Sequence, residues 1–477
     1  MNHCDFGDRD SLGLKKKTIS VAPSEQSDKR SPRMRSSMET DHEARTNDSQ
    51  KDRIALLVTY LNIVLYALCF QLQRPVEPFL VTSLSTQAGG NSAQVSKTYG
   101  QLQSFFNAVQ TIGSPLVGIL LDRIGIRDAS VVVFASTALS YLILAYATDM
   151  NLLFLSKVPT VLQAAFLVAQ ATASTATGGD AAARAQALGR MTTAYTIGAT
   201  IGPVLGGWLA DHGDLYFSAK VAVVGSLVSV ILSWAFLPTA TFYAKTTKEE
   251  EKTVSLADSL KRSLSIGLRP NVLPLLAVKL VGGVVASIFS TALPLVLTQQ
   301  LHFDASQLGL GMSASMFSVA GFSAIFMAPL AKWIGPDGMV SVGLLGRACI
   351  APMMAMILSW TGTAYNLDSK SMVVVQVTTV SVFHALSAHL LATGLTTLTT
   401  GTVEKDEQGA LLGLEHSLFS LARIAGPAIG TTLLASKSNN LDGFWLVAGC
   451  SAVIDVLLMS FLFLTQRKES SHFTKKM

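Results

Sequence analysis

Eight charged side chains lie inside stretches of the sequence that are otherwise almost wholly apolar. Five are basic and three are acidic: Arg74, Glu77, Lys157, Lys279, Arg347, Glu415, Arg423 and Asp455. A charge at the centre of a membrane helix costs about 2.5 to 3.5 kcal/mol, so such residues normally face a cavity or a partner. All of them except Glu415, together with Gln103 and Asn107 on another apolar stretch, are therefore candidate sites for a solute or a proton.

The spacing of these charges allows few pairs on one helix. Arg74 and Glu77 are three residues apart and can neutralise each other, beside Pro75 and Pro78, which should break the helix. Glu415 stands eight residues before Arg423 and can pair with it only loosely, and Asp455 has no predicted partner. Lys157 can face an apolar cavity and respond to an anion or a proton, or it can extend to the membrane surface. The excess of basic over acidic residues favours an anionic or neutral solute.

The composition is that of a membrane protein with many helices. Of its 477 residues 49% are hydrophobic and 14% are charged, and the mean hydropathy is +0.43, values that a soluble protein of this length would not normally have. The four cysteines are far apart and have no spacing typical of disulfides or metal ligands. No nucleotide-binding loop or catalytic arrangement is found. We therefore expect no enzyme activity, cofactor, metal, nucleic-acid partner or required protein partner.

Apolar runs long enough to cross about 30 Å of hydrocarbon follow one another from Ile54 onward. They predict an all-α integral membrane protein with twelve transmembrane helices, near 54–80, 99–121, 129–148, 151–173, 188–210, 217–237, 271–297, 307–333, 339–360, 371–396, 408–435 and 443–465.

A long polar segment divides the spans six and six. The predicted parts are a disordered cytosolic tail at 1–52, a six-helix bundle at 53–238, a cytosolic linker at 239–270, a second six-helix bundle at 271–466 and a cytosolic tail at 467–477. In the linker, the spacing of Leu256, Leu260 and Leu264 indicates a helix lying on the membrane surface.

Basic residues gather in the loops on one side of these spans. They are Arg123, Arg127, Arg184, Arg190, the basic residues of the linker, Lys332, Lys405, Arg467, Lys468, Lys475 and Lys476. By the positive-inside rule this side, with both termini, is expected to face the cytosol.

A glycine-rich apolar stretch, GATIGPVLGGWLA at 198–210, is unusual for a helix. Small residues let membrane helices approach closely, and Pro203 frees a backbone carbonyl and bends the helix. The residues that form this predicted packing face are Gly198, Gly202, Pro203, Gly206 and Gly207. Gly189, Gly202, Pro203 and Gly206 recur with the same spacing as Gly413, Gly426, Pro427 and Gly430, so the two halves are related.

A second motif, GILLDRIGIR at 118–127, joins the second and third spans. Gly118 and Gly125 allow a tight turn, Asp122 can accept from backbone amides at a helix start, and Arg123 and Arg127 can pair with carboxylates or lipid phosphates. The corresponding text in the second half, AKWIG at 331–335, has Lys332 where an aspartate would be expected.

These two motifs, with twelve spans in two halves, resemble the major facilitator superfamily. Within it the chain is similar to drug:proton antiporters, the tetracycline-type exporters and the organic-cation-transporter-like proteins of animals, in the segments at 99–123, 152–170 and 409–430. The resemblance implies two pseudo-symmetric six-helix bundles. It also implies that the 118–127 loop latches the halves together when the transporter opens outward, with Asp122 facing Gln408 and Gly409, and that the helix at 198–210 seals the path.

The sequence departs from those relatives at two places. Lys157 stands where they usually have an arginine in a motif linked with coupling, and their buried aspartate in the first span has no match, which leaves Glu77 as its substitute. The expected function is secondary active transport of a small organic solute by alternating access, with solute:proton antiport. The alternatives are an uncoupled facilitator, an organic anion exchanger, and a membrane scaffold or receptor that does not transport. The resemblance to cation transporters and the excess of basic residues conflict over the charge of the solute.

Overall fold

The computed structural model describes the backbone of residues 32–177, 180–239, 256–363, 370–404, 407–437 and 440–474. Within these ranges all regular structure is helical. The chain divides into two units, Met1–Lys51 and Asp52–Met477. Most of the predicted N-terminal tail and the first part of the linker lie outside the described residues, and α1 begins at Pro32, inside the stretch assigned to that tail.

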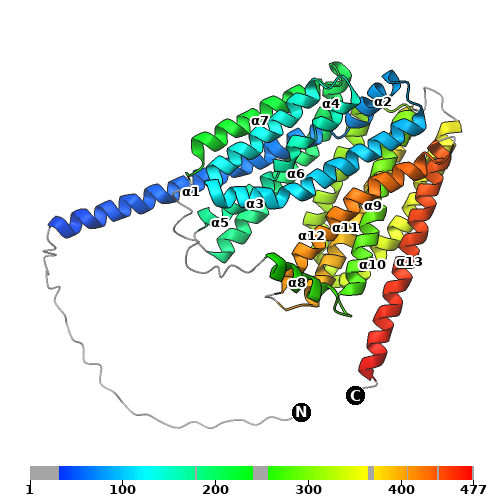
Figure 1. Ribbon diagram of the computed structural model, residues 1–477. Coiled ribbons are helices and arrows are strands. Elements are labelled where there is room, and N and C mark those ends of the chain that lie inside the picture. The colour runs from blue at the N-terminus through cyan, green and yellow to red at the C-terminus, as the bar shows by residue number, and fades with distance from the viewer. Residues whose placement is uncertain are drawn as a thin grey trace, which may run out of the picture. The chain divides into compact units, whose positions relative to one another are not determined.

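The helices of the two halves follow the predicted spans closely (Figure 1). The first half contains α1 (Pro32–Leu72), α2 (Glu77–Gln87), α3 (Ser92–Ala145), α4 (Met150–Leu155), η1 (Val158–Leu162), α5 (Ala165–Ala176), α6 (Ala181–His212) and α7 (Phe217–Phe236). The second half contains α8 (Leu256–Gly267), α9 (Leu273–Gln299), α10 (Ala305–Thr363), α11 (Lys370–Gly401), α12 (Gln408–Leu434) and α13 (Asn440–Thr474).

Nine helical stretches in the described residues are long and apolar enough to cross a membrane. Two of them, α3 and α10, each contain two spans joined at a glycine with positive φ, Gly125 at 82° and Gly335 at 68°. Only glycine adopts this backbone conformation without strain. The glycine-rich α6 is not among the nine. Counting both parts of α3 and of α10, and adding α6, gives the twelve predicted spans.

Two spans are interrupted where the candidate residues lie. The first span stops at Leu72 and resumes at Glu77 across Pro75, so Arg74 sits in a turn. The fourth span is divided into α4, η1 and α5, and Lys157 precedes the short helix η1. Proline has no amide hydrogen and cannot continue an α-helix ladder, which explains both breaks.

The repeated glycines produce the same packing in both halves. Gly198, Gly202 and Gly206 of α6 lie against the backbone of α1 so closely that an added Cβ would come within 3.0 Å of it. In the second half, Gly426 and Gly430 of α12 lie against α9 in the same way. The repeated glycines therefore pack α6, the fifth span, on α1, the first span, and α12, the eleventh span, on α9, the seventh span.

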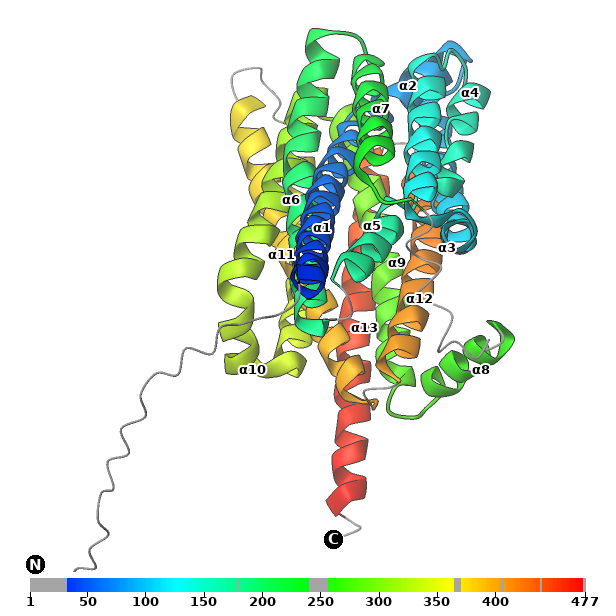
Figure 2. The same cartoon turned by 90° about the vertical axis from the view of Figure 1, so that its left-hand side faces the viewer.

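The two halves meet at one end of the helices, which we call the closed end, and spread apart toward the other (Figure 1). There Ser92 of the first half donates to Gln299 of the second at 2.9 Å, and Asn440 donates to Ser92 at 3.0 Å. The other end, called here the linker end, carries α8 (Figure 2) and the turns at Gly125 and Gly335.

Two close seams join the halves toward the closed end, and each pairs a glycine with a proline of the repeated motif. An added Cβ at Gly100 would lie 2.7 Å from the carbonyl oxygen of Pro427, and one at Gly309 would lie 2.1 Å from that of Pro203. The seams α3 with α12 and α6 with α10 are therefore related by the pseudo-symmetry of the chain.

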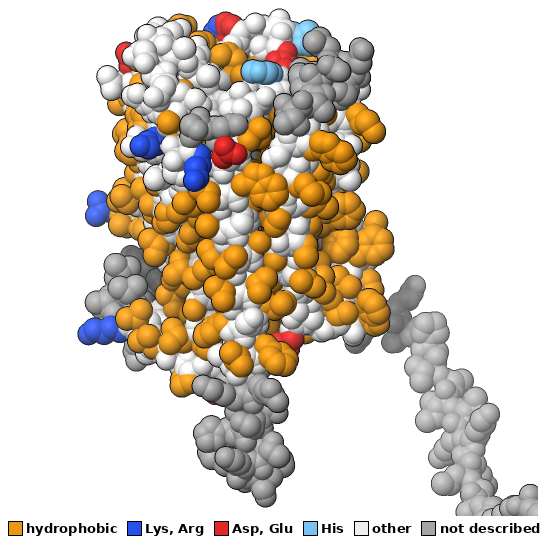
Figure 3. All heavy atoms as spheres, turned by 90° about the vertical axis from the view of Figure 1, so that its right-hand side faces the viewer, with side chains coloured by type: hydrophobic (Ala, Val, Ile, Leu, Met, Phe, Trp, Pro, Cys, Tyr) orange, Lys and Arg blue, Asp and Glu red, His pale blue; other side chains and the backbone are white. Residues whose placement is uncertain are grey.

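The outer surface is suited to lipid. Figure 3 shows apolar side chains covering the middle of one face, with charged side chains mainly toward its two ends. Large apolar residues that are exposed include Trp234, Phe326 and Trp360. Soluble monomers rarely expose so large an apolar surface, which is typical of contact with a membrane.

Candidate functional site

The carboxylate of Glu77 forms a buried ion pair in the first half. Nζ of Lys157 lies 2.6 Å from Oε1 of Glu77, and the amide of Gln103 donates to Oε2 at 2.6 Å. Lys157 also lies over the ring of Phe106, 5.6 Å from its centre. The expected pairing of Glu77 with Arg74 is therefore wrong, because packing brings the break in span 4 against the break in span 1.

The two carboxylates of the second half are also paired. Glu415 contacts Nζ of Lys279 and the hydroxyl of Thr399. Asp455 lies 3.1 Å from Nη2 of Arg347, and both side chains are almost fully buried. The expectations of a loose pair between Glu415 and Arg423, and of Asp455 without a partner, are thus corrected.

The Arg347 to Asp455 contact is within ion-pair distance but outside hydrogen-bonding geometry, since neither oxygen of Asp455 has a hydrogen-bond partner among the described residues. Arg347 also donates to the carbonyl of Gly282 at 3.1 Å. The pair ties α10, α13 and α9 together inside the second half, and Lys279 likewise binds α9 to α11 and α12. Both pairs lie within one half.

Of the eight charges, Arg74 and Arg423 are left without an ionic partner in the part of the chain that the structure describes. Both are half-buried, and they come from opposite halves. Arg423 stacks on Phe419 at 5.8 Å and lies close enough to Arg74, Tyr66 and Tyr195 to interact with them electrostatically. An uncompensated pair of guanidinium groups in this position would attract an anion.

Asn107 connects this region across the two halves. Its amide donates to the carbonyl of Arg423 at 3.1 Å and to the carbonyl of Gln103 at 2.7 Å on its own helix. Gln103 in turn holds Glu77, so one chain of polar contacts runs from the Glu77 and Lys157 pair to Arg423.

A cavity of about 210 Å³ lies between the halves. Its lining includes Gln71, Arg74 and Pro203 from the first half and Ser290, Gln307, Met312, Ser315, Met316, Thr378 and Ser381 from the second. A second space of about 30 Å³ surrounds Glu77, Gln103 and Lys157, and Arg74 lines both. Arg74 thus stands between the central cavity and the buried ion pair.

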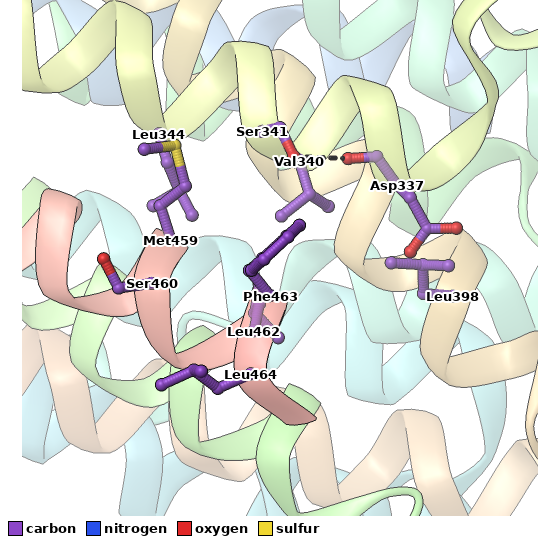
Figure 4. A pocket seen from close by; sticks show the side chains of 10 residues that line it. All are labelled: Asp337, Val340, Ser341, Leu344, Leu398, Met459, Ser460, Leu462, Phe463 and Leu464. Atoms are coloured by element: carbon purple, nitrogen blue, oxygen red, sulfur yellow. Dashed lines mark hydrogen bonds between the residues drawn. The ribbon is translucent and has the colours of Figure 1, made fainter. Parts of the chain in front are cut away.

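A larger cavity of about 470 Å³ lies elsewhere, among α10, α11 and α13 (Figure 4). Its lining residues are mostly apolar, and all come from the second half, with Asp337 as the one charged side chain. A cavity that is lined by one half alone cannot be opened first to one side of the membrane and then to the other by movement of the two halves relative to each other. We therefore take the cavity that includes Arg74 as the candidate solute site.

The sequence profile of the Major Facilitator Superfamily matches residues 59–383, more than half of the chain. The chain belongs to this superfamily. Solute carrier family 22 member 18 of Mus musculus is 24% identical over 387 residues, covering 80% of this chain and 89% of the relative. The class E tetracycline resistance protein of Escherichia coli is 24% identical over 414 residues, covering 85% and 93%. The crystal structure of the human organic anion transporter MFSD10 matches with a TM-score of 0.57 at 18% identity, covering 86% and 99%.

These matches confirm the predicted resemblance to drug:proton antiporters and the major facilitator fold of two six-helix bundles. A member of this superfamily is an integral multi-pass membrane protein that transports solutes and is not an enzyme.

The superfamily loop at 118–127 lies at the linker end, with Leu121 and Ile126 buried. Asp122 and Arg123 are exposed, and within the described residues neither side chain has an ionic or hydrogen-bonding partner, whereas Arg127 pairs with its neighbour Asp128 at 3.0 Å. Gly409, the expected counterpart of Asp122, has open space where a side chain would lie. The latch role remains a prediction, because it concerns the conformation that opens outward.

The superfamily's antiporter-motif helix divides its glycines between two neighbours. Gly198, Gly202 and Gly206 face α1 of the same half, while Gly207 faces α10 of the other, with an added Cβ only 2.2 Å from the carbonyl oxygen of Ala305. The sealing role stays a prediction, but Gly207 and Pro203 lie at the seam where such a seal would form.

Sequence reasoning missed the polar lining that the second half contributes. Ser290, Ser315, Thr378 and Ser381 lie in apolar spans and face the central cavity. The spacing of Thr378 and Ser381, three residues apart on one helix, is the local signal that indicates a polar face.

Proposed function

We propose that the protein carries a small organic anion through the cavity between its halves by alternating access. The observation that supports the charge of the solute is that Arg74 and Arg423 lack carboxylate partners among the described residues, while Glu77, Glu415 and Asp455 are all engaged with cations. A cationic solute would have to break one of these buried pairs. An anion would compensate two charges that are now unpaired.

The position of the two arginines suggests how a solute promotes movement. Arg74 belongs to the first half and lines the cavity, and Arg423 of the second half is close enough to interact with it electrostatically, so an anion bound beside Arg74 attracts both halves. The hydroxyls of Ser290 and Thr378 and the amide of Gln71 can hydrogen-bond the remainder of the solute. Pockets for drug-sized ligands measure roughly 300 to 1,000 Å³, so the cavity of about 210 Å³ favours a small molecule.

Proton coupling is proposed to pass through Glu77. Arg74 acts electrostatically on this carboxylate, so neutralising Glu77 leaves more positive charge beside the cavity. A proton at Glu77 would therefore strengthen binding of an anion, which favours movement of proton and anion in the same direction. The resemblance to drug:proton antiporters predicts the opposite direction, and uncoupled exchange predicts no proton movement.

The test is uptake and counterflow in proteoliposomes that contain an internal pH dye. The solutes are small aromatic carboxylates and sulfonates, with amines of the same size as a comparison. We expect uptake of anions, and we expect Arg74→Gln and Arg423→Gln each to weaken it roughly 10- to 100-fold, the range for losing a hydrogen bond to a charged group. Arg190→Gln, which changes an exposed arginine on α6, is the matched control. Uptake of amines that is insensitive to both arginine variants would refute the proposal, and the dye gives the direction of coupling.

A further inference from the structure

Asp211, near the end of α6, reaches across to the other half of the molecule. Its two carboxylate oxygens accept from the backbone amides of Ala305 at 3.3 Å and Ser306 at 2.9 Å. These are the first two residues of α10. The aspartate itself is exposed at the closed end.

The start of α10 shows why this contact matters. The first four amides of a helix have no partner inside the helix. Asp304 accepts from the amide of Gln307 at 2.8 Å, and the side chain of Gln307 accepts from the amide of Asp304 at 3.1 Å, which is a capping box. The amides of Ala305 and Ser306 are not satisfied by this arrangement, and Asp211 satisfies both of them. The cap of α10 is therefore completed by the other half of the protein.

The charge of Asp211 adds to these hydrogen bonds. The N-terminus of a helix carries a partial positive charge, so a carboxylate beside it is stabilised. The contact lies at one end of the tight seam between α6 and α10. In this seam Gly207 faces Ala305, and Pro203 faces Gly309. The amide of Val204 also donates to the hydroxyl of Ser313 at 3.0 Å. Opening the closed end requires α6 to separate from α10. The amides of Ala305 and Ser306 and the carboxylate of Asp211 then lose these hydrogen bonds and are exposed to water.

We propose that Asp211 is a latch that holds the closed end shut in this conformation and must release α10 before that end opens. The proposal rests on the alternating access proposed above. In this proposal Asp211 acts at the closed end, whereas Asp122 is predicted to hold the linker end shut in the other conformation. Asp211 faces the start of α10, and Asp122 is predicted to face the start of α12 in the other conformation.

The experiment measures the width of the closed end directly. Spin labels are attached at Gln87→Cys and Lys437→Cys, exposed positions on opposite halves, in full-length protein in lipid nanodiscs with Cys4, Cys349 and Cys450 replaced by serine. Distance distributions are recorded by double electron–electron resonance without solute. We expect Asp211→Asn, which removes the charge and leaves one of the two amides without an acceptor, to shift the ratio of closed to open populations roughly fivefold toward open, as for the loss of one hydrogen bond.

Asp214→Asn is the matched control. Asp214 lies three residues away at the same end, but it binds Lys220 at 2.8 Å and the amide of Tyr216 at 2.9 Å within its own half. Its variant should leave the distances unchanged. Equal distributions for Asp211→Asn and the unsubstituted protein, or equal shifts for the two aspartate variants, would overturn the latch.

A second variant tests the seam if Asp211→Asn yields no folded protein. Gly207→Ala pushes a methyl group toward the carbonyl of Ala305 and should move α10 away from Asp211, whereas Gly189→Ala on the same helix meets no atom within 4 Å. A shift of the distance distribution toward the open state in Gly207→Ala but not in Gly189→Ala supports the latch. Distances that are unchanged in Gly207→Ala contradict it. Because no solute is present, a protein that fails to transport organic anions can still show the shift, so the two proposals fail separately.

Discussion

Lys157 and Glu77 form an ion pair of 2.6 Å between two interrupted spans. Each residue stands next to a break that proline imposes, at Pro75 and at Pro159. Irregular backbone at membrane depth is tolerated only where protein or a water-filled cavity covers it. The breaks in spans 1 and 4 cover each other, and the ion pair lies where they meet.

The first prediction concerns the stability of this pair. Glu77→Gln and Lys157→Gln should each lower the free energy of unfolding by about 3 to 5 kcal/mol, because removing one partner leaves a buried charge unpaired. The double variant should lose much less than the sum. Thermal unfolding of the purified protein in detergent measures all three. If the double variant loses as much as both single variants together, the two residues act independently and the pair is not the stabilising unit.

The second prediction concerns the repeated glycines. Gly206→Ala should destabilise the protein by about 1 to 3 kcal/mol through overpacking, because an added Cβ would lie 2.1 Å from the carbonyl oxygen of Leu72. Gly189→Ala, on the same helix with open space beside it, should be neutral or slightly stabilising. The measurement is again the unfolding midpoint. Equal midpoints for the two variants would mean that α6 can move away from α1 at little cost.

The third prediction concerns Asp122. Asp122→Asn should slow transport at least severalfold while leaving solute binding nearly unchanged, since the exposed carboxylate is far in sequence from the cavity-lining residues and is expected to act only when the linker end closes. Equilibrium binding and counterflow on the same preparation separate the two effects. Asp128→Asn, another exposed aspartate at this end, serves as the comparison. Normal counterflow by Asp122→Asn would count against the latch role.

The fourth prediction concerns pH at the linker end. Arg269 binds Glu407 through two hydrogen bonds of 2.6 Å, joining the segment before α9 to the start of α12. The hydrogen bonds from Arg269 lower the pKa of Glu407, with the charges of Arg269 and Arg262 acting in the same direction. Because this pKa is lower in the folded protein, the contribution to stability is complete above the ordinary pKa of glutamate, about 4.3, and is lost as the pH falls through the folded value.

Hydrogen exchange of the α8 to α9 segment, measured from pH 6 down to pH 3 and corrected for intrinsic exchange rates, checks this expectation. Protection should fall in the acidic part of that range. Arg269→Gln should already show reduced protection at pH 6 and a weaker dependence on pH. A pH profile that is the same in both proteins would show that another group controls this segment.

Local patterns in the sequence predicted much of the fold. The turn at Gly125 and the break at Pro75 depend on backbone rules that act over a few residues, and the structure has them where they were predicted, whereas Pro78 lies in the first turn of α2 and does not break it. The same holds for the small-residue face of α6, which packs closely on α1. What could not be predicted is that Gly207 faces a different helix from Gly206, since adjacent residues point in different directions and the identity of each neighbour depends on the assembled bundle.

The sequence by itself determined that the chain crosses a membrane many times, that its halves are related, and which side chains would be costly to bury. These properties follow from hydrophobicity and from spacing along one helix. Only the tertiary structure decided the partner of each charge: Glu77 pairs with Lys157 and Glu415 with Lys279, far apart in the chain, while Arg74 and Arg423 have no ionic partner in the part of the chain that the structure describes. Ion pairing depends on distances of a few ångströms between helices, and no local pattern encodes those distances before the helices pack.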